Sequence, residues 1–205
     1  MERWLFLIIV SLLVIQTNAS AQNEKINLTG RHALFLDGGF KTNSTTSVVV
    51  TGGSVETKTG FIGNFNYGYW FDNEWSLTLS AGVFGAEAST NYNNVETNAI
   101  IPILFGIRYY PEKLSLGQVG RFYAGLSLGE YMGFATKTKT AFSTETVNEA
   151  VFGGQASIGI DLFAAPWFKV GPKFSYHFIS DYSEVIGVKK NLSGAAFALE
   201  FGFVF

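Results

Sequence analysis

Apolar and polar residues alternate with a period of two along most of the chain, which predicts β-strands with two unlike faces. The pattern is clearest in GAAFALEFGFVF, residues 194–205. From Phe197 onward every second residue of this stretch is Leu or Phe, and the residues between them are mostly small. One face of such a strand suits a hydrophobic core or a lipid environment.

Eight segments carry this alternation, and we predict a strand in each: 30–41, 60–71, 75–85, 98–110, 121–133, 150–164, 167–178 and 194–205. Short connections are predicted at 72–74 and 164–166, and a medium one at 111–120. Longer polar connections, rich in Ser, Thr, Asn and Gly, are predicted at 42–59, 88–97, 134–149 and 180–192. Short turns at one end and long loops at the other, on an even number of strands, indicate an all-β fold. We predict an eight-stranded antiparallel up-and-down transmembrane β-barrel with both termini at the short-turn end.

The charged side chains decide which face meets lipid. Seven of them lie on the strand face opposite the large apolar residues: Arg31, Asp37, Arg108, Asp161, Lys169, Lys173 and Glu200. A Lys or Arg that faces the middle of a membrane costs about 2–4 kcal/mol, so a wall in contact with lipid lacks such charges. We therefore predict a polar lumen in which these charges form a network. Arg108 or Lys173 could pair with Glu200 or Asp161, and the sequence leaves the pairing open.

Two residues depart from this pattern. Glu130 falls on the apolar face of its strand, which indicates a place at the outer interface or a local shift of register. Pro172 has no N–H for a strand ladder and predicts a local irregularity.

Aromatic residues gather near the short connections. With residues 1–21 set aside, the tryptophans are Trp70, Trp75 and Trp167. Together with Tyr109 they are predicted to form an aromatic girdle where acyl chains meet headgroups, and neighbouring aromatics extend it: Tyr69, Tyr110 and Phe168. The alternative, that these rings cap a soluble core, accounts for their clustering but not for their shared end.

The amino-terminal segment predicts export. Arg3 is followed by an apolar run over residues 4–15 and by the small residues Ala19-Ser20-Ala21. This is the pattern of a secretory signal peptide, so we expect residues 1–21 to be removed and residues 22–205 to form the barrel domain. An uncleaved membrane anchor is the alternative.

Composition removes several classes of function. The chain has no cysteine, which excludes disulfides and thiolate metal sites. Its net charge is −2 with dispersed cations, so no surface for nucleic acid is predicted. Only 15% of the residues are charged, while Gly occurs 23 times and Phe 20 times. That mixture suits a barrel with a small-residue interior and an apolar exterior better than a soluble α/β enzyme.

Candidate catalytic chemistry is sparse. His32 and His177 are the only imidazoles, and a Ser-His-acid set can be drawn from Ser180, His177 and Glu184. No known motif surrounds these residues, so we predict that His177 lines the lumen and that the protein has no catalytic, cofactor or metal site. Side chains fill the interior of an eight-stranded barrel, which favours a structural plug over a narrow conduit for small solutes. A lipid-modifying enzyme is the third hypothesis.

The closing FALEFGFVF and the segment IIPILFGIRYYP, residues 100–111, resemble small OmpA-like outer-membrane β-barrels of Gram-negative bacteria. The resemblance extends to the outer membrane protein β-barrel domain family, especially its Bacteroidetes-like members. It covers nearly all of the mature chain, although its motifs are loose patterns. It implies this fold and a location in the cell outer membrane, while the family spans many unrelated roles. We expect a monomer surrounded by outer-membrane lipid, with a structural or loop-mediated interaction role in the envelope. The resemblance also implies that the barrel-assembly machinery reads Phe201, Phe203 and Phe205 as an assembly signal.

Overall fold

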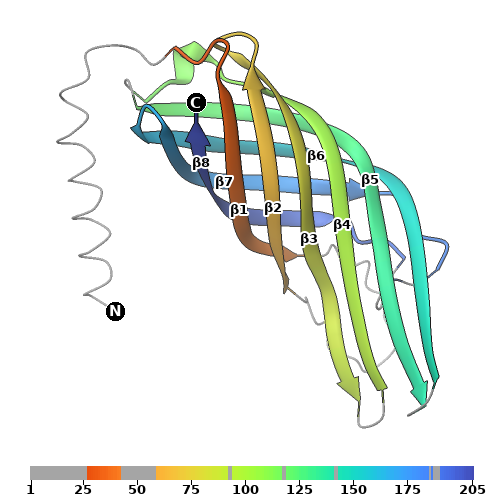
Figure 1. Ribbon diagram of the computed structural model, residues 1–205. Coiled ribbons are helices and arrows are strands. Elements are labelled where there is room, and N and C mark those ends of the chain that lie inside the picture. Colours follow the sequence, from red (N-terminus) through yellow and green to blue (C-terminus); the bar gives the residue numbers. More distant parts are fainter. Residues whose placement is uncertain are drawn as a thin grey trace, which may run out of the picture.

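The chain folds into a closed barrel in which each strand pairs with the next and the last pairs with the first (Figure 1). The computed structural model describes residues 27–42, 59–91, 94–116, 119–140, 143–184, 186 and 190–205. All eight pairings are antiparallel, which confirms the predicted fold class. The predicted signal peptide lies outside the described residues. The strands are β1 (His32–Thr42), β2 (Thr59–Trp70), β3 (Trp75–Asn91), β4 (Asn94–Tyr109), β5 (Gly120–Thr140), β6 (Ser143–Ala165), β7 (Phe168–Ile179) and β8 (Gly194–Val204).

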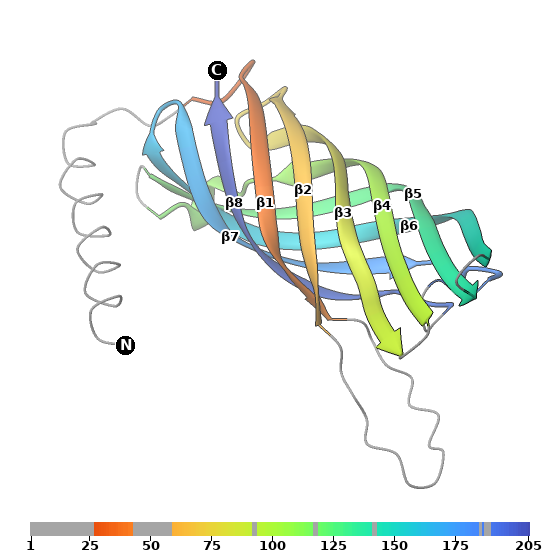
Figure 2. The same ribbon diagram turned by 60° about the horizontal axis from the view of Figure 1, so that its bottom comes forward.

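The four central strands are longer than the others and project beyond one rim of the barrel (Figures 1 and 2). Strands β3 to β6 contain 16 to 23 residues, whereas β1, β2, β7 and β8 contain 11 or 12. The loops predicted at 88–97 and 134–149 are therefore wrong for the most part, because strand pairing continues through them. These stretches are polar, and for that reason they were predicted to be loops. Their threonine and valine residues nevertheless favour extended backbone, and the stretches form strands.

The opposite rim carries the short connections and the end of β8. The turn between β6 and β7, a single 3-10 turn η1 (Glu112–Leu114) and the β2–β3 turn all lie there. The backbone N–H of His32 donates to Phe205, and that of Phe205 donates to His32, so the first and last strands meet at this rim. Among the described residues, no helix is long and apolar enough to cross a membrane.

Register and alternation sort the side chains into two sets. Leu36 lies between Phe65 of β2 and Phe201 of β8, and the three are 60%, 51% and 46% exposed. The next residue, Asp37, pairs in register with Glu200, and both side chains are buried. Because this pattern repeats around the barrel, the outer wall is apolar and the lumen holds the polar groups.

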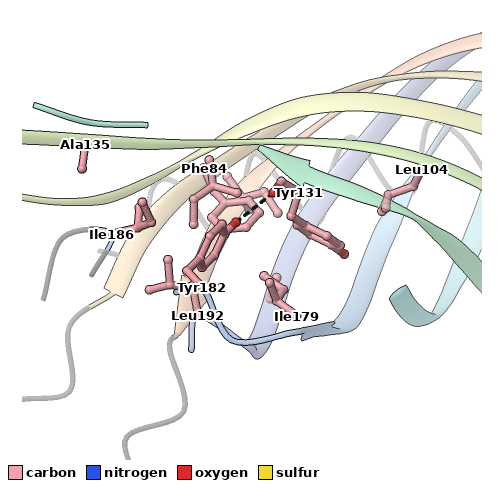
Figure 3. Close-up of a cluster of buried hydrophobic side chains, with 11 residues drawn as sticks. Phe84, Leu104, Tyr131, Ala135, Ile179, Tyr182, Ile186 and Leu192 are labelled. Atoms are coloured by element: carbon pink, nitrogen blue, oxygen red, sulfur yellow. Dashed lines mark hydrogen bonds between the residues drawn. The ribbon is translucent and has the colours of Figure 1, made fainter. Parts of the chain in front are cut away.

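Two apolar clusters close the lumen, one at each end. The base cluster lies at the short-turn rim and consists of Leu28, Ala33, Phe35, Trp70, Tyr110, Tyr123, Phe163 and Val204. The mouth cluster lies at the opposite end (Figure 3) and consists of Ile62, Phe84, Ile100, Leu104, Tyr131, Ala135, Ile179, Tyr182, Ile186, Leu192 and Ala196. The polar part of the lumen therefore lies between the base cluster and the mouth cluster.

The two exceptional residues have separate explanations. Glu130 pairs in register with Ile103 and Phe152 and is exposed on the outer wall, so the register shift considered for it is wrong. Next to Pro172, a Cβ on Gly171 would clash with the carbonyl oxygen of Ile160. Strands β6 and β7 thus approach unusually closely where Pro172 offers no donor, and only glycine fits that contact.

Candidate functional site

Four charged side chains from four strands form one linked set inside the lumen. Arg108 donates two hydrogen bonds to Glu200, with Nη1–Oε1 at 3.0 Å and Nη2–Oε2 at 2.8 Å. Lys169 Nζ lies 2.7 Å from Glu200 Oε1 and 2.8 Å from Asp161 Oδ2. Tyr110 also donates to Asp161, at 3.1 Å. A two-pronged Arg–carboxylate pair with further donors is the geometry in which buried charges are tolerated.

A second set is built around Asp37. Lys173 Nζ lies 2.9 Å from Asp37 Oδ2. The amide of Asn64 donates to Asp37 Oδ1 at 2.5 Å, and that of Asn66 donates to Asp37 Oδ2 at 3.0 Å. Ser80 in turn donates to the side-chain oxygen of Asn66. Every oxygen of this buried carboxylate therefore accepts at least one hydrogen bond.

The two sets together are electrically balanced. We call their six charged residues the charge layer: Asp37, Arg108, Asp161, Lys169, Lys173 and Glu200. It contains three cations and three anions, all buried. Aromatic rings complete the surroundings of the cations, since the Arg108 guanidinium lies 4.7 Å from the centre of the Phe35 ring and 4.4 Å from that of Tyr123. The layer is thus a neutral, internally satisfied unit rather than an open binding surface.

Arg31 does not join the charge layer, in contrast to the prediction. It precedes β1 at the short-turn rim, where its carbonyl accepts a hydrogen bond from the Trp70 backbone. It is half-buried, and it forms no ion pair with a described residue. Because the chain enters β1 only after this position, its side chain lies beyond the layer.

Trp70 was predicted in the outer girdle, and the structure corrects this. It is 1% exposed and faces the lumen, where its ring lies 5.7 Å from Lys169 Nζ. Tyr110 is buried in the same base cluster. Alternation explains Trp70: since Tyr69 lies on the outer wall, the next residue must point inward.

The other predicted girdle residues lie on the outer wall. The rings of Trp75 and Tyr109 are 4.6 Å apart, and Trp167 stacks on Phe203 with 6° between the ring planes. The three predicted assembly residues share one exposed face at the end of β8: Phe201, Phe203 and Phe205. Their role in assembly stays a prediction.

The Ser-His-acid set is not assembled. His177 is buried, with Nδ1 3.1 Å from the Tyr131 hydroxyl and Nε2 3.1 Å from the side-chain nitrogen of Gln155. Ser180 and Glu184 are exposed beyond the end of β7. Within the described part of the chain, no group of His, Asp and Glu side chains has an arrangement that could hold a metal ion.

The segment after β7 folds inward over the mouth. Tyr182 reaches into the mouth cluster and donates its hydroxyl to the Tyr131 carbonyl at 3.1 Å (Figure 3). Lys41 Nζ donates to the Leu192 carbonyl at 2.5 Å and lies 4.8 Å from the centre of the Phe84 ring. In the predicted loop at 180–192, the described residues Tyr182, Ile186 and Leu192 therefore help to close the lumen.

Glu149 of β6 forms hydrogen bonds with the segment that follows β7. It accepts hydrogen bonds from the Ser183 hydroxyl at 2.5 Å, the Ser183 backbone at 2.8 Å and the Glu184 backbone at 3.1 Å. These bonds, above all the one from the Ser183 hydroxyl, lower the pKa of the Glu149 carboxyl below its ordinary value. The closed mouth thus includes one acid-sensitive contact.

Sequence reasoning missed the aromatic residues of the lumen. Phe35 and Tyr123 occupy inward positions by simple alternation, so their parity was a usable signal for the base cluster. Tyr182 carried no such signal, because it lies in a non-repeating segment and its burial depends on tertiary packing.

No protein-family model matches the chain, and no curated protein matches it by sequence. Solved structures do match. Ail, the attachment invasion locus protein of Yersinia pestis, gives a TM-score of 0.57 at 14% identity, over 86% of this chain and 99% of that chain. Neisserial surface protein A, NspA, gives 0.58 at 14% identity, over 86% and 98%. The outer membrane protein OprG of Pseudomonas aeruginosa gives 0.52 at 15% identity, over 89% and 99%. This chain therefore has the fold of a small outer-membrane β-barrel, with the apolar wall that such a location demands.

Proposed function

We propose that this protein is a closed structural barrel of the outer membrane, of the OmpA-like type and similar to Bacteroidetes members, that acts in the envelope without conducting solutes. The observation that carries the proposal is the arrangement of the lumen, in which a neutral charge layer is closed by an apolar cluster at each end. A conduit needs a continuous polar path, and both clusters interrupt it.

The outer wall supports membrane residence. Among strand residues whose side chains are described, the outward positions carry a charged or imidazole group only at His32 and Glu130. The apolar remainder of the wall would be exposed to water if the protein were soluble. Burying that wall in lipid is the arrangement that the hydrophobic effect favours.

The projecting hairpins are the second part of the proposal. Strands β3 to β6 rise beyond the rim and present their ends to the surroundings, so they supply the surface through which a partner would be met (Figure 2). No ligand follows from their geometry alone. The structural role therefore belongs to the barrel wall, and any interaction role belongs to the hairpins.

A complementation experiment tests the structural role. We expect a strain without this protein to become more sensitive to bile-salt detergent, and the wild-type protein to restore resistance. A trimmed variant, in which residues 136–146 are replaced by Asn-Gly between the paired Ala135 and Val147, should restore it as well.

Two outcomes contradict the proposal. An unchanged detergent sensitivity of the deletion strain would remove the structural role. A trimmed variant that reaches wild-type levels in the membrane but restores nothing would assign the function to the β5–β6 hairpin.

A further inference from the structure

His32 is an exception on the outer wall. It is the first residue of β1, and it lies at the short-turn rim, where its backbone pairs with Phe205. Alternation places its imidazole outward with Leu34 and Leu36, away from the charge layer. An imidazole on a lipid-facing wall is costly unless a polar partner meets it there.

The ring is held in one orientation. Its Nδ1 lies 2.6 Å from the hydroxyl of Tyr67. Its centre lies 4.9 Å from that of the Tyr69 ring, and it stacks on Phe205 at 5.9 Å with 19° between the planes. The contact with Tyr67 engages Nδ1 of His32, so the imidazole and the Tyr67 hydroxyl form a fixed polar pair at the rim.

An apolar groove of about 360 Å³ begins at this pair. Its lining includes His32, Tyr67, Tyr69, Leu77, Leu79 and Phe105. Register gives its direction: Tyr69 lies beside Leu77, Tyr67 beside Leu79, and Leu79 beside Phe105. The groove therefore runs from the polar pair at the rim toward the middle of the wall, where its lining is apolar apart from Thr78.

The polar end of the groove lies at the level of the girdle. Trp75, whose ring contacts Tyr109, is the first residue of β3, as His32 is of β1. Aromatic residues of this kind occupy the zone where headgroups meet acyl chains. The polar end thus lies at headgroup depth, and the apolar end lies at acyl-chain depth.

We propose that this groove binds one glycerophospholipid of the leaflet at the short-turn side. The phosphate accepts one hydrogen bond from the His32–Tyr67 pair, either from the Tyr67 hydroxyl or from His32 Nε2–H according to the tautomer, and one acyl chain lies along Leu77, Leu79 and Phe105. Its volume is in the range of small-molecule sites. The change from polar to apolar along its length matches an amphiphile, which brings a polar headgroup to His32 and an apolar chain to the rest of the groove. The inference rests on the proposed membrane residence.

Native mass spectrometry of the folded, detergent-solubilised protein tests it. We expect the protein to retain one molecule of dioleoyl phosphatidylglycerol, and to bind dioleoyl glycerol, which has the same chains without phosphate, about tenfold more weakly. Inorganic phosphate alone should not compete, because the chain contributes to binding. Equal retention of the two lipids, or displacement by inorganic phosphate, would overturn the site.

Variants locate the site on the wall. His32→Phe keeps the stacked ring but removes the polar contact, and it should weaken retention about tenfold. Leu79→Trp should fill the groove and abolish retention, while the matched Leu199→Trp on the outward face of β8 should leave it unchanged. All three change residues of the outer wall, and a shift in gel mobility on boiling verifies that each variant is folded.

The alternative results are separable. Wild-type retention in His32→Phe, or equal losses in the two Trp variants, would overturn the site while leaving the barrel in the membrane. A folded protein that stays monodisperse without detergent would instead overturn membrane residence itself.

Discussion

Glu200 is the side chain on which most of the lumen charge depends. Its buried carboxylate accepts one hydrogen bond from each of the two terminal nitrogens of Arg108 and one from Lys169. Removing one member of a buried ion pair leaves the other charges without compensation, which costs more than the pair itself contributes. Its loss would leave Arg108 without its carboxylate and Lys169 with Asp161 alone.

We therefore expect Glu200→Ala to lower the free energy of unfolding by about 3–5 kcal/mol, measured by urea titration of the protein folded into lipid vesicles. Glu184→Ala, at an exposed carboxylate, should change it by less than about 0.5 kcal/mol. A double variant with Arg108→Met and Glu200→Leu should be more stable than Glu200→Ala, because it leaves no orphaned guanidinium. Equal effects of the two single variants would show that the charge layer does not stabilise the barrel.

At this scale, alternation predicted which face a residue occupies but not which residue it meets. It placed Asp37, Arg108 and Glu200 in the lumen correctly. The pairing of Arg108 on β4 with Glu200 on β8 crosses the barrel, and no local pattern encodes a contact between strands that are not neighbours. The error at Trp70 had another origin, since residue type was allowed to override the parity of its strand.

At the scale of elements, the strands were predictable and their outer limits were not. All eight occur within a few residues of the expected ranges at the short-turn end. At the other end β5 and β6 continue to Thr140 and Ser143, because backbone pairing does not require an apolar face once the chain has left the lipid. Hydrophobic alternation marks the part of a strand that is in contact with lipid, not the full length of the ladder.

The segment that closes the mouth gives a pH prediction. In the folded state the pKa of Glu149 is depressed below its ordinary value of 4.5, so its contribution is complete above that pH and is lost as the pH falls through the folded-state pKa. We expect amide exchange at Ser183 and Glu184 to accelerate, relative to the rest of the barrel, as the pH is lowered below about 4.5.

Glu149→Gln is the matched control for this effect. It keeps the shape of the side chain but cannot titrate, so relative exchange at the two amides should be faster at neutral pH and should no longer respond to acid. A wild-type response that persists unchanged in this variant would assign the acid sensitivity to another group.

For the molecule as a whole, the lumen is the feature with the clearest consequence. A path across it would have to pass the base cluster, the charge layer and the mouth cluster in turn. We expect the purified protein to insert into planar bilayers without unitary current steps, under conditions in which an open porin conducts. Reproducible steps would mean that the clusters open, and the conduit hypothesis would then replace the structural one.

The pairing of β1 with β8 also governs how the molecule can form. Ala33 lies opposite Val204, so the seam of the barrel joins the two extremes of the described chain. The other seven strand pairs join strands that are consecutive in the sequence, so they can form one after another. The β1–β8 pair joins distant segments and can form only once β8 is present. Until then the sheet has two unpaired edge strands, and the hydrocarbon of a bilayer offers no hydrogen-bond partners for their N–H and C=O groups. Assembly therefore has a sealing step, and the time before that step is when the protein is most vulnerable to misassociation.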